Sequence, residues 1–585
     1  MIINNHYISK GVLMEAKEGH VFQPLEIMKK DIKIAYFSME ICIDARIPTY
    51  SGGLGILAGD MLRSSADLGV SLVGVTLLYK KGYLHQKIGK EGLQQELPEK
   101  WNPQDYMELL PNKILIEIEG RRVSVQAWFF CIKGLDNYCI PVLFLDTDLP
   151  ENSVYDRSLS DFLYGGDRRY RLAQEIVLGI GGVRMLGAQG YNNISKYHMN
   201  EGHASLLTLE LLNHYNNQEE KWSNSAIEKV KKLCNFTTHT PVPAGMDQFS
   251  YELVEKVLRS PIPISLLKEL GGKERLNMTA LALNLSHYIN GVAKRHGDVS
   301  QEMFPGYHID SITNGVHSAT WICLHFQKLY DRYIPGWRKD SFSLRYALNI
   351  PNEEVWQAHQ EAKKILIDSI FQETGVQLDP EVLTIGFARR ATAYKRADLI
   401  FYDINRLVDI SRKYGKIQLV FSGKAHPKDD PGKKLIRKII QVSQQLKGEI
   451  EIVYLENYNM NLAKKMVSGV DLWLNTPKKP QEASGTSGMK AAHNGIPSLS
   501  ILDGWWIEGC IEGFTGWSIG SSPDIESSDQ EDAASLYDKL QNIVIPTYYM
   551  NRGKWINIMR HCVAMNASFF NTQRMVLQYV LHAYL

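Results

Sequence analysis

The sequence lacks an excess of charge of either sign. Its 585 residues contain 65 Lys and Arg against 64 Asp and Glu, which gives a net charge of +1 with histidine neutral. A chain this close to neutrality has no overall electrostatic attraction to nucleic acid or to an anionic membrane. We therefore expect no nucleic-acid or membrane partner, and any anionic ligand must be held by a local site.

Cysteine is scarce, and long apolar runs are missing. The seven cysteines are odd in number, scattered and never spaced as C-x-x-C, which argues against a disulfide framework and against a zinc knuckle. Residues 1–20 contain no apolar core of signal-peptide length, and no uncharged apolar run is long enough to span a membrane. These absences predict a protein of a reducing compartment, the cytoplasm.

Alternating strands and helices are what the sequence has in quantity. Hydrophobic residues make up 44% of the chain, enough for a large core at this length. A first zone opens with a β-branched strand over 32–37, a glycine-rich loop and a helix over 54–68. A second zone places strands at 383–387, 417–421, 450–454, 472–475 and 498–502. Parallel strands need crossover helices and covered faces, so both zones predict α/β lobes.

The predicted division of the chain follows from these two zones. We expect an N-terminal lobe with insertions over 1–345, a helical linker over 346–378, a C-terminal lobe over 379–530 and C-terminal helices over 531–585. Ligands of open α/β sheets bind outside the carboxyl ends of the strands. The loops after strands are therefore where chemistry is expected.

The first candidate site is the loop Ser51-Gly52-Gly53-Leu54-Gly55, which leads into a predicted helix. Glycines let the backbone approach a ligand closely, and a helix N-terminus offers free N–H groups to an anion. Gly53, Gly55 and Ala58 also match G-x-G-x-x-A. A dinucleotide site, however, needs the glycines directly after the strand and an acid closing the next one, and neither is present. We interpret the segment as a phosphate or sugar loop, with an ordinary glycine turn as the alternative.

Cations gather at the end of the strand predicted over 383–387. They are Arg389, Arg390, Lys395 and Arg396, and Lys424 follows the next strand. Taken in isolation, these cations are explained slightly better by a solvated surface. Their place at the carboxyl end of a strand favours an oxyanion clamp of the kind that phosphoryl groups need.

Small residues and hydroxyls precede a predicted helix in the segment Glu482–Lys490, EASGTSGMK. Such a turn binds anions, and Lys490 would lie about one turn into the helix. A lysine there could form an imine with an aldehyde cofactor. The alternative is a plain Ser/Gly loop with a surface lysine.

Histidines also follow two predicted strands. His239 ends one strand, and His198, Glu201 and His203 belong to the end of another. Their spacing is not H-E-x-x-H, and no carboxylate or cysteine lies at a fixed offset from them. We predict no metal site, and we expect these residues to have structural or sugar-contacting roles.

Taken in order, these segments resemble the α-glucan phosphorylases, the family of glycogen, starch and maltodextrin phosphorylases. Glu482–Lys490 resembles that family's cofactor-lysine motif, E-A-S-G-T-G-N-M-K. Supporting matches run from residue 36 to beyond residue 503, and they are 36–40 (YFSME), 51–55, 200–203 (NEGH), 238–240 (THT), 312–315 (ITNG), Trp321, 394–396 (YKR) and 455–458 (LENY).

The resemblance implies a role for each matching residue. Lys490 would hold pyridoxal 5′-phosphate as a Schiff base. The other cofactor residues would be Arg389, Thr486 and Ser487 at its phosphate, with Gly53, Tyr458 and Trp321 around its pocket. The substrate phosphate would be bound by Arg390, Lys395, Gly52 and Gly53. The glucan would be contacted by Glu482, Ser484, Gly485, Asn314, His203 and the backbone carbonyl of His239. The residues expected to be catalytic are Lys490, Arg390, Lys395, His239 and Glu482.

The resemblance also implies a fold and a reaction. The fold would be the glycosyltransferase-B architecture, two Rossmann-like lobes with the active site in the cleft between them. The reaction would be reversible, anomer-retaining phosphorolysis of an α-1,4-glucan or maltooligosaccharide. Inorganic phosphate would be the second substrate, α-glucose 1-phosphate the product and a homodimer the assembly. In this family the phosphate of the cofactor, not its imine, exchanges the proton with the substrate phosphate.

Several positions depart from the pattern of the long members of the family. Thr392-Ala393 stands where those enzymes have His-Glu, Ser487-Gly488 replaces Gly-Asn, and Trp505-Trp506 replaces two small residues. The chain is shorter, and no counterpart of the phosphorylated N-terminal segment is found. We therefore expect the short prokaryotic branch, with no regulation through that segment.

Three rival functions would each leave a different pattern in the sequence. A glycogen or starch synthase would carry K-x-G-G-L and E-x7-E, whereas Tyr50 precedes the loop here and Lys490 stands eight residues after Glu482. An inactive glucan-binding protein would not need the phosphate clamp. A conventional amino-acid enzyme of the pyridoxal type does not share the sugar motifs, although only a substrate test excludes it.

Overall fold

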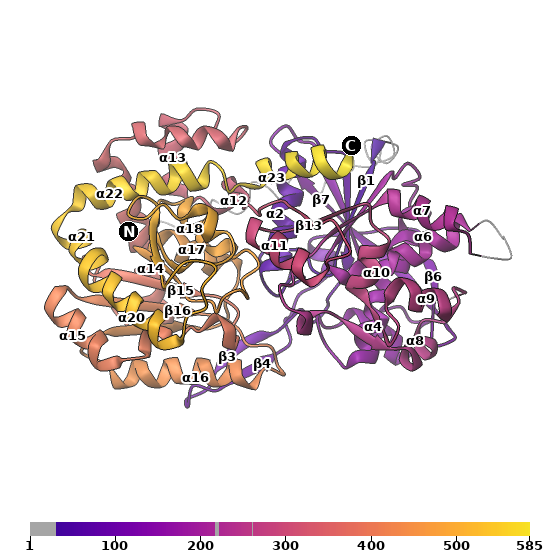
Figure 1. The fold of residues 1–585 in the computed structure, drawn as a ribbon, viewed down its shortest axis with the longest axis horizontal. Helices are drawn as coiled ribbons and strands as arrows, with labels where there is room; N and C mark the ends of the chain where they lie inside the picture. The colour runs from indigo at the N-terminus through magenta and orange to yellow at the C-terminus, as the bar shows by residue number, and fades with distance from the viewer. Residues whose placement is uncertain (1–30, 217–221, 260) are drawn as a thin grey trace.

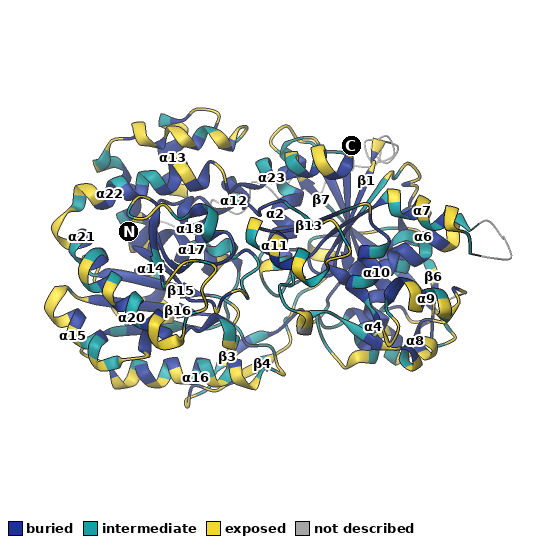
Figure 2. Ribbon diagram, viewed as in Figure 1, coloured by how far each residue is buried: buried dark blue, intermediate teal, exposed yellow. Residues whose placement is uncertain are grey.

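The computed structural model describes residues 31–216, 222–259 and 261–585. Two α/β lobes lie side by side, the N-terminal one on the right of Figure 1 and the C-terminal one on the left. In each lobe, buried strands lie between helices whose outer faces are exposed (Figure 2). The predicted two-lobed α/β architecture is confirmed. Residues 1–30, which include the segment searched for a signal peptide and the beginning of the predicted first lobe, lie outside the described residues.

Among the described residues of the first lobe, ten strands form its sheet, and β1 lies near the centre. From β14 to β8 the neighbours are parallel, and β7, β5 and β6 add an antiparallel edge. In spatial order the strands are β14 (Asp310–Ser311), β13 (Tyr288–Gly291), β10 (Cys234–Thr237), β9 (Lys196–Asn200), β1 (Ile34–Ser38), β2 (Leu72–Leu77), β8 (Cys139–Asp146), β7 (Arg121–Lys133) and β5 (Glu108–Leu109), with β6 (Ile114–Ile118) paired to β7.

The second lobe has a wholly parallel sheet of six strands. In spatial order they are β17 (Glu451–Leu455), β16 (Ile417–Ser422), β15 (Leu383–Ala388), β18 (Leu472–Asn475), β19 (Ser498–Ile501) and β20 (Gly516–Ile519). The strands β15 to β19 match the predicted ones. The short edge strand β20 was not predicted, because its four residues begin with a glycine and give almost no periodicity.

Helices cover both sheets. Those of the first lobe are α2 (Gly53–Asp67), α3 (Val154–Arg157), α4 (Arg168–Ile176), α5 (Gly182–Ala188), α6 (Leu207–Tyr215), α7 (Asn224–Leu233), α8 (Tyr251–Val257), α9 (Ile264–Gly271), α10 (Met278–Asn284) and α11 (Lys294–Met303). The later ones are α12 (Ser318–Trp321), α13 (Leu324–Tyr333), α14 (Asn352–Thr374), α15 (Ile404–Tyr414), α16 (Asp430–Gln445), α17 (Met460–Gly469), α18 (Thr486–Ala492), α19 (Trp506–Gly509), α20 (Asp529–Lys539), α21 (Ile545–Met550), α22 (Arg552–His561) and α23 (Thr572–Tyr579).

The chain crosses between the lobes earlier than the predicted boundary at residue 345. Phe326 and Tyr330 of α13, and Trp337 after it, are packed in the core of the second lobe. The apolar face of α13 therefore belongs with the second lobe. The exact boundaries of the predicted domains stay a prediction.

The helices predicted over 531–585 divide between the two cores. Residues 533–567 contribute to the core of the second lobe, whereas Met575, Val576 and Tyr579 of α23 pack against the first. The helix α23 crosses to the first lobe at the top of Figure 1, where the chain ends. It packs there because its apolar residues at helical spacing meet those of α2 and β1.

A hairpin of the first lobe reaches across to the second. Strands β3 (His85–Ile88) and β4 (Gln94–Leu97) lie beside α16 in Figure 1. Gln86 N donates to Asn457 Oδ1 at 3.1 Å, and Asn457 N donates to Gln86 Oε1 at 2.8 Å. Gln94 forms the same reciprocal pair with the backbone of Ala425, at 2.9 Å in both directions. These paired amides join the lobes at one side.

One disulfide is present, although the scattered cysteines predicted no disulfide framework. It joins Cys131 on β7 to Cys139 on the neighbouring β8, with the Cα atoms 5.6 Å apart. The pairing of these two antiparallel strands brings the cysteines together, which their sequence spacing did not indicate. Within the described ranges, no helix is long and apolar enough to cross a membrane.

Candidate active site

The glycine loop begins helix α2, as predicted. Ser51 N and Gly52 N donate to Glu40 Oε2 at 2.5 and 3.2 Å, and Tyr164 donates to Oε1 of the same carboxylate at 2.8 Å. A Cβ atom added at Gly52 or Gly53 would meet no atom within 4 Å. The glycines therefore face open space, where a ligand can approach their backbone.

Lys490 lies on α18 and is 7% exposed. Its Nζ stands 4.1 Å from the centroid of the Trp321 ring, so these two predicted cofactor residues lie next to one another. Burial lowers the pKa of Lys490 to about 8, with Asp60 and Cys42 opposing the shift and Arg389 adding to it. Because the ordinary pKa is 10.5, a much larger fraction of this amine is neutral and nucleophilic near pH 7.

Arg389 and Lys395 converge on the carboxylate of Glu482. Arg389 Nη2 lies 2.6 Å from Glu482 Oε2, and Lys395 Nζ donates to the same oxygen. Burial alone would raise the pKa of Glu482, but the two cations outweigh it and hold the pKa below its ordinary value. Two cations on one oxygen show that both side chains reach a single anionic position.

Arg390 does not join that cluster. It is exposed, and its charge acts on a residue of each lobe. It opposes the rise that burial causes in the pKa of Tyr83, and it adds to the fall that burial causes in the pKa of His426. It lines one small cavity together with Arg389 and Lys395 at the carboxyl end of β15. The three predicted cations thus share one region, with Arg390 on its solvent side.

Asp503 orients the loop that carries Glu482, a role that sequence reasoning missed. Its Oδ2 accepts from Glu482 N and its Oδ1 accepts from Gly504 N, both at 2.9 Å. Burial raises the pKa of Asp503 to about 7, and the charge of Glu482 adds to the rise. Asp503 lies two residues after the end of β19, and this place at a strand end was the sequence feature that could have indicated its role.

The rest of the segment 482–490 prepares the start of α18. Gly485 adopts φ 84°, a left-handed conformation that favours glycine. Ser484 Oγ is buried without a partner among the described residues, and Ser487 Oγ accepts from Trp473 Nε1 at 3.2 Å. Thr486 is the first residue of the helix. Tyr458 lies close enough to Arg389 for the cation to oppose the rise that burial causes in the tyrosine pKa.

The first lobe contributes His239 and its neighbours. His239 Nε2 is 2.6 Å from Asn200 Oδ1, and His239 N donates to Glu201 Oε2 at 2.8 Å. Burial lowers the pKa of His239 to about 3, so the ring is neutral at physiological pH. These bonds fix the backbone of His239, whose carbonyl is the group expected to contact the sugar.

Asn314 and His203 each hold a polar atom without a partner in the part of the chain described. Asn314 is 3% exposed, and its Oδ1 is unpaired. His203 Nδ1 is unpaired as well, while Nε2 lies 3.4 Å from Asp247. Buried unpaired acceptors and donors are uncommon, and a ligand with hydroxyl groups would satisfy them.

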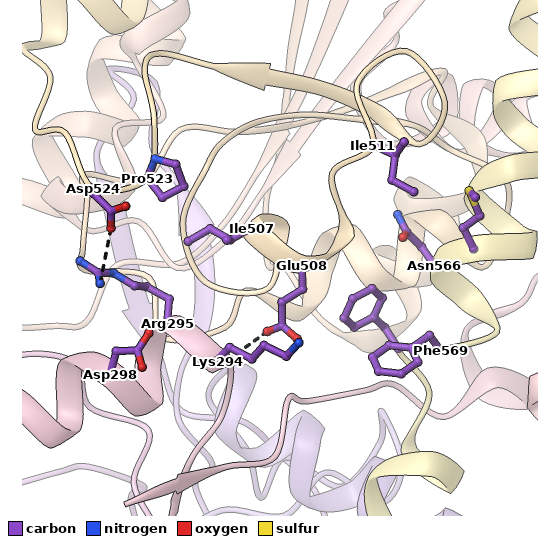
Figure 3. A pocket seen from close by; sticks show the side chains of 12 residues that line it. Lys294, Arg295, Asp298, Ile507, Glu508, Ile511, Pro523, Asp524, Asn566 and Phe569 are labelled. Atoms are coloured by element: carbon purple, nitrogen blue, oxygen red, sulfur yellow. Dashed lines mark hydrogen bonds and ion pairs between the residues drawn. The ribbon is translucent and has the colours of Figure 1, made fainter.

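A cavity of about 540 Å³ also opens between the lobes, and none of the predicted site residues line it. Figure 3 shows Lys294 and Arg295 on one wall and Glu508, Asn566 and Phe569 on the other. Glu508 accepts from Thr313 Oγ1 at 2.9 Å and from Lys294 N at 3.0 Å. Since Asn314 follows Thr313, Glu508 ties the second lobe to this strand end. Sequence reasoning gave no signal for Glu508.

Known proteins resemble the chain over almost its whole length. The family model described as carbohydrate phosphorylase matches residues 262–512. A maltodextrin phosphorylase of Thermococcus litoralis is 41% identical, over 94% of this chain and 70% of that protein. Glycogen phosphorylases of Aquifex aeolicus and Mycobacterium tuberculosis are 37% and 35% identical, each over 94% of this chain and over 85% and 70% of their own lengths.

The matched span agrees with the geometry. It includes the cations after β15, the Glu482–Lys490 segment and Asp503, which the fold brings to one end of the second sheet. The matches to these relatives cover 94% of the chain and therefore extend into the first lobe as well. On this combined evidence, the chain belongs to the carbohydrate phosphorylase family.

Proposed function

We propose that this chain is an α-1,4-glucan phosphorylase, a retaining glycosyltransferase that uses inorganic phosphate to release α-glucose 1-phosphate from the non-reducing end of a glucan or maltooligosaccharide. The observation that carries the proposal is the meeting of Lys490 and Arg389 of the second lobe with Trp321 and α2 beneath the glycine loop of the first. The relatives named as maltodextrin and glycogen phosphorylases support it.

The residues at Lys490 fit pyridoxal 5′-phosphate. The buried amine has a pKa near 8 and a flat indole beside it, and Arg389 supplies a cation to the same space. Thr486 and Ser487 bring hydroxyls and N–H groups to the helix start, and Tyr458 lies beside Arg389. When bound, this cofactor supplies a phosphate that exchanges a proton with the substrate phosphate.

The protein's own part in the chemistry is to hold anions together. Two phosphates in contact repel, and their second ionisation lies near neutrality. Arg390, Lys395 and the backbone at Gly53 lower that repulsion by holding the substrate phosphate. The negative charge of that phosphate then stabilises the positive charge that develops on the transferred glucosyl ring. Substrate phosphate then protonates the glycosidic oxygen and attacks the anomeric carbon from the same side, which retains the configuration.

Glucose is oriented from both lobes. Glu482, Ser484 and Gly485 of the second lobe meet its hydroxyls, while Asn314, His203 and the His239 carbonyl of the first lobe complete the contacts. The unpaired Ser484 Oγ, Asn314 Oδ1 and His203 Nδ1 are the atoms that support this assignment. Closing the lobes around the sugar excludes water, which favours phosphorolysis over hydrolysis.

We also propose that the protein is a homodimer and that it works in the cytoplasm, as the family resemblance suggests. Light scattering of the purified protein measures the oligomeric state. Fractionation of expressing cells measures the location.

The test is a reaction of the purified protein with a maltooligosaccharide and inorganic phosphate, followed by assay of α-glucose 1-phosphate. We expect product that requires phosphate, and we expect its loss in Lys490→Ala together with loss of the bound cofactor. Free glucose formed without phosphate would contradict the proposal. So would glucan elongation that requires a nucleotide sugar, or transamination of an amino acid.

A further inference from the structure

A completely buried carboxylate lies close to Lys490 but belongs to the other lobe. Asp60 stands two helical turns into α2, and its exposed fraction is 0%. Taking an unpaired carboxylate out of water is costly, so a buried one requires partners. Asp60 has one charged partner, Arg63, and its second oxygen accepts from an indole N–H.

Asp60 is held by two donors. Its Oδ2 accepts from Trp321 Nε1 at 2.6 Å, and its Oδ1 accepts from Arg63 Nη1 at 3.1 Å. Arg63 Nη2 in turn donates to the carbonyls of Cys42 and Ile43 at 3.1 and 2.8 Å. The carboxylate is therefore fixed in place, with one oxygen directed at the indole.

The indole connects Asp60 to Lys490. The Lys490 Nζ lies 4.1 Å from the ring centroid, in the range of a cation–π contact. A carboxylate that accepts the indole N–H polarises the ring and makes its face more negative. Both the direct field of Asp60 and the polarised ring favour positive charge at Nζ.

The other groups that act on Lys490 do not supply a negative charge. They are Cys42 and Arg389. Burial raises the pKa of the Cys42 thiol to about 12, so it is neutral at physiological pH, and Arg389 is a cation. Lys464, a basic residue whose pKa is lowered by burial, also interacts with Asp60 and Cys42 and supplies no negative charge. Asp60 is thus the anion among the described groups that face this amine.

Helix α2 packs tightly against the segment 40–42, and this contact fixes the position of Asp60. A Cβ atom at Gly59 would lie 1.9 Å from the Cys42 carbonyl oxygen, and one at Gly55 would lie 2.7 Å from Glu40 Oε2. The two glycines, one turn apart, let the helix approach the 40–42 segment. Asp60 follows Gly59 directly, so its position depends on that approach.

We propose that Asp60 is a positioning residue that acts through Trp321 as the counter-charge of Lys490, keeping Nζ positively charged both as the free ammonium and as the imine formed with the cofactor. This inference rests on the proposed function, because the imine nitrogen is Lys490 Nζ itself. The same first-lobe helix that begins at the phosphate loop would then also set the charge at the cofactor's point of attachment.

The experiment is a pH titration of the absorption spectrum of the reconstituted holoprotein. The protonated imine absorbs at longer wavelength than the neutral form, so the band ratio gives the imine pKa. For Asp60→Asn we expect that pKa to fall by about one unit or more, since an opposing charge favours the charged form. Trp321→Phe keeps a ring beside Nζ and removes the N–H bond, so it should shift the pKa in the same direction.

Asp67→Asn is the matched control. Asp67 lies on the same helix and is paired with His317 at 2.8 Å, away from Lys490, so its loss should leave the imine pKa unchanged. An unchanged pKa in both Asp60→Asn and Trp321→Phe would overturn the proposal, as would an equal fall in Asp67→Asn. A wild-type protein that forms no imine band with added cofactor would instead overturn the proposed function.

Discussion

Glu482 shows how one buried anion can bring two cations together, as the proposed phosphate site requires. Its carboxylate draws Arg389 and Lys395 to a common position, and Asp503 fixes the backbone that carries it. A phosphate oxygen entering this region would meet cations that are already oriented, which lowers the reorganisation needed on binding. The acid therefore prepares the position that the two cations would share with an anionic ligand.

Replacement of Glu482 tests whether its carboxylate stabilises the two cations. In Glu482→Gln, two nearly buried cations lose their shared anion, and unfolding should become easier by about 3 kcal/mol. Inorganic phosphate should restore part of the loss by binding the unpaired cations, and thermal unfolding in phosphate and in chloride of equal ionic strength measures this. Asp471→Asn is the control, because Asp471 pairs with the buried Lys363 and His359 within the second lobe. It should be destabilised without rescue, and equal rescue of both variants would contradict the account.

At the scale of elements, helix α2 combines two kinds of glycine. Gly52 and Gly53 face open space, whereas Gly55 and Gly59 face backbone or side-chain atoms that leave no room for a methyl group. The first pair leaves the loop accessible to a ligand, and the second pair sets the distance between α2 and the 40–42 segment. One helix thereby carries the glycine loop at its start and Asp60 at its centre.

Alanine substitutions should separate these roles. Gly53→Ala should leave stability within about 0.5 kcal/mol, because the new methyl group meets nothing, while the KM for phosphate rises with little change in the KM for glucan. Gly59→Ala should lower the free energy of unfolding by about 1–3 kcal/mol, because a Cβ atom would overlap the Cys42 carbonyl. Chemical denaturation and steady-state kinetics measure the two effects. A Gly53→Ala variant that loses stability as much as Gly59→Ala would contradict this division.

At the scale of the whole molecule, the residues that could be predicted are those whose role is local. The glycine loop, the cations after β15 and the Glu482–Lys490 segment each lie at a strand end or helix start, and such positions show in the sequence. Asp60 and Trp321 are 261 residues apart, and Gln86 and Asn457 are 371 apart. These pairs form only when the chain folds into its tertiary structure, which periodicity does not reveal. The packing of α23 against the first lobe could not be predicted either, because it also depends on tertiary contacts.

The central claim is that the cofactor is attached at Lys490. A second lysine, Lys424, offers a comparison within the same protein. Burial also lowers the pKa of Lys424 to about 8, but its Nζ donates to the Leu84 carbonyl at 2.8 Å instead of facing an aromatic wall. The most direct measurement is reduction of the pyridoxal 5′-phosphate-loaded protein with borohydride, followed by peptide mass spectrometry. The account predicts a pyridoxyl phosphate adduct on the peptide that contains Lys490. An adduct on Lys424 or another lysine, with Lys490 unmodified, would contradict it.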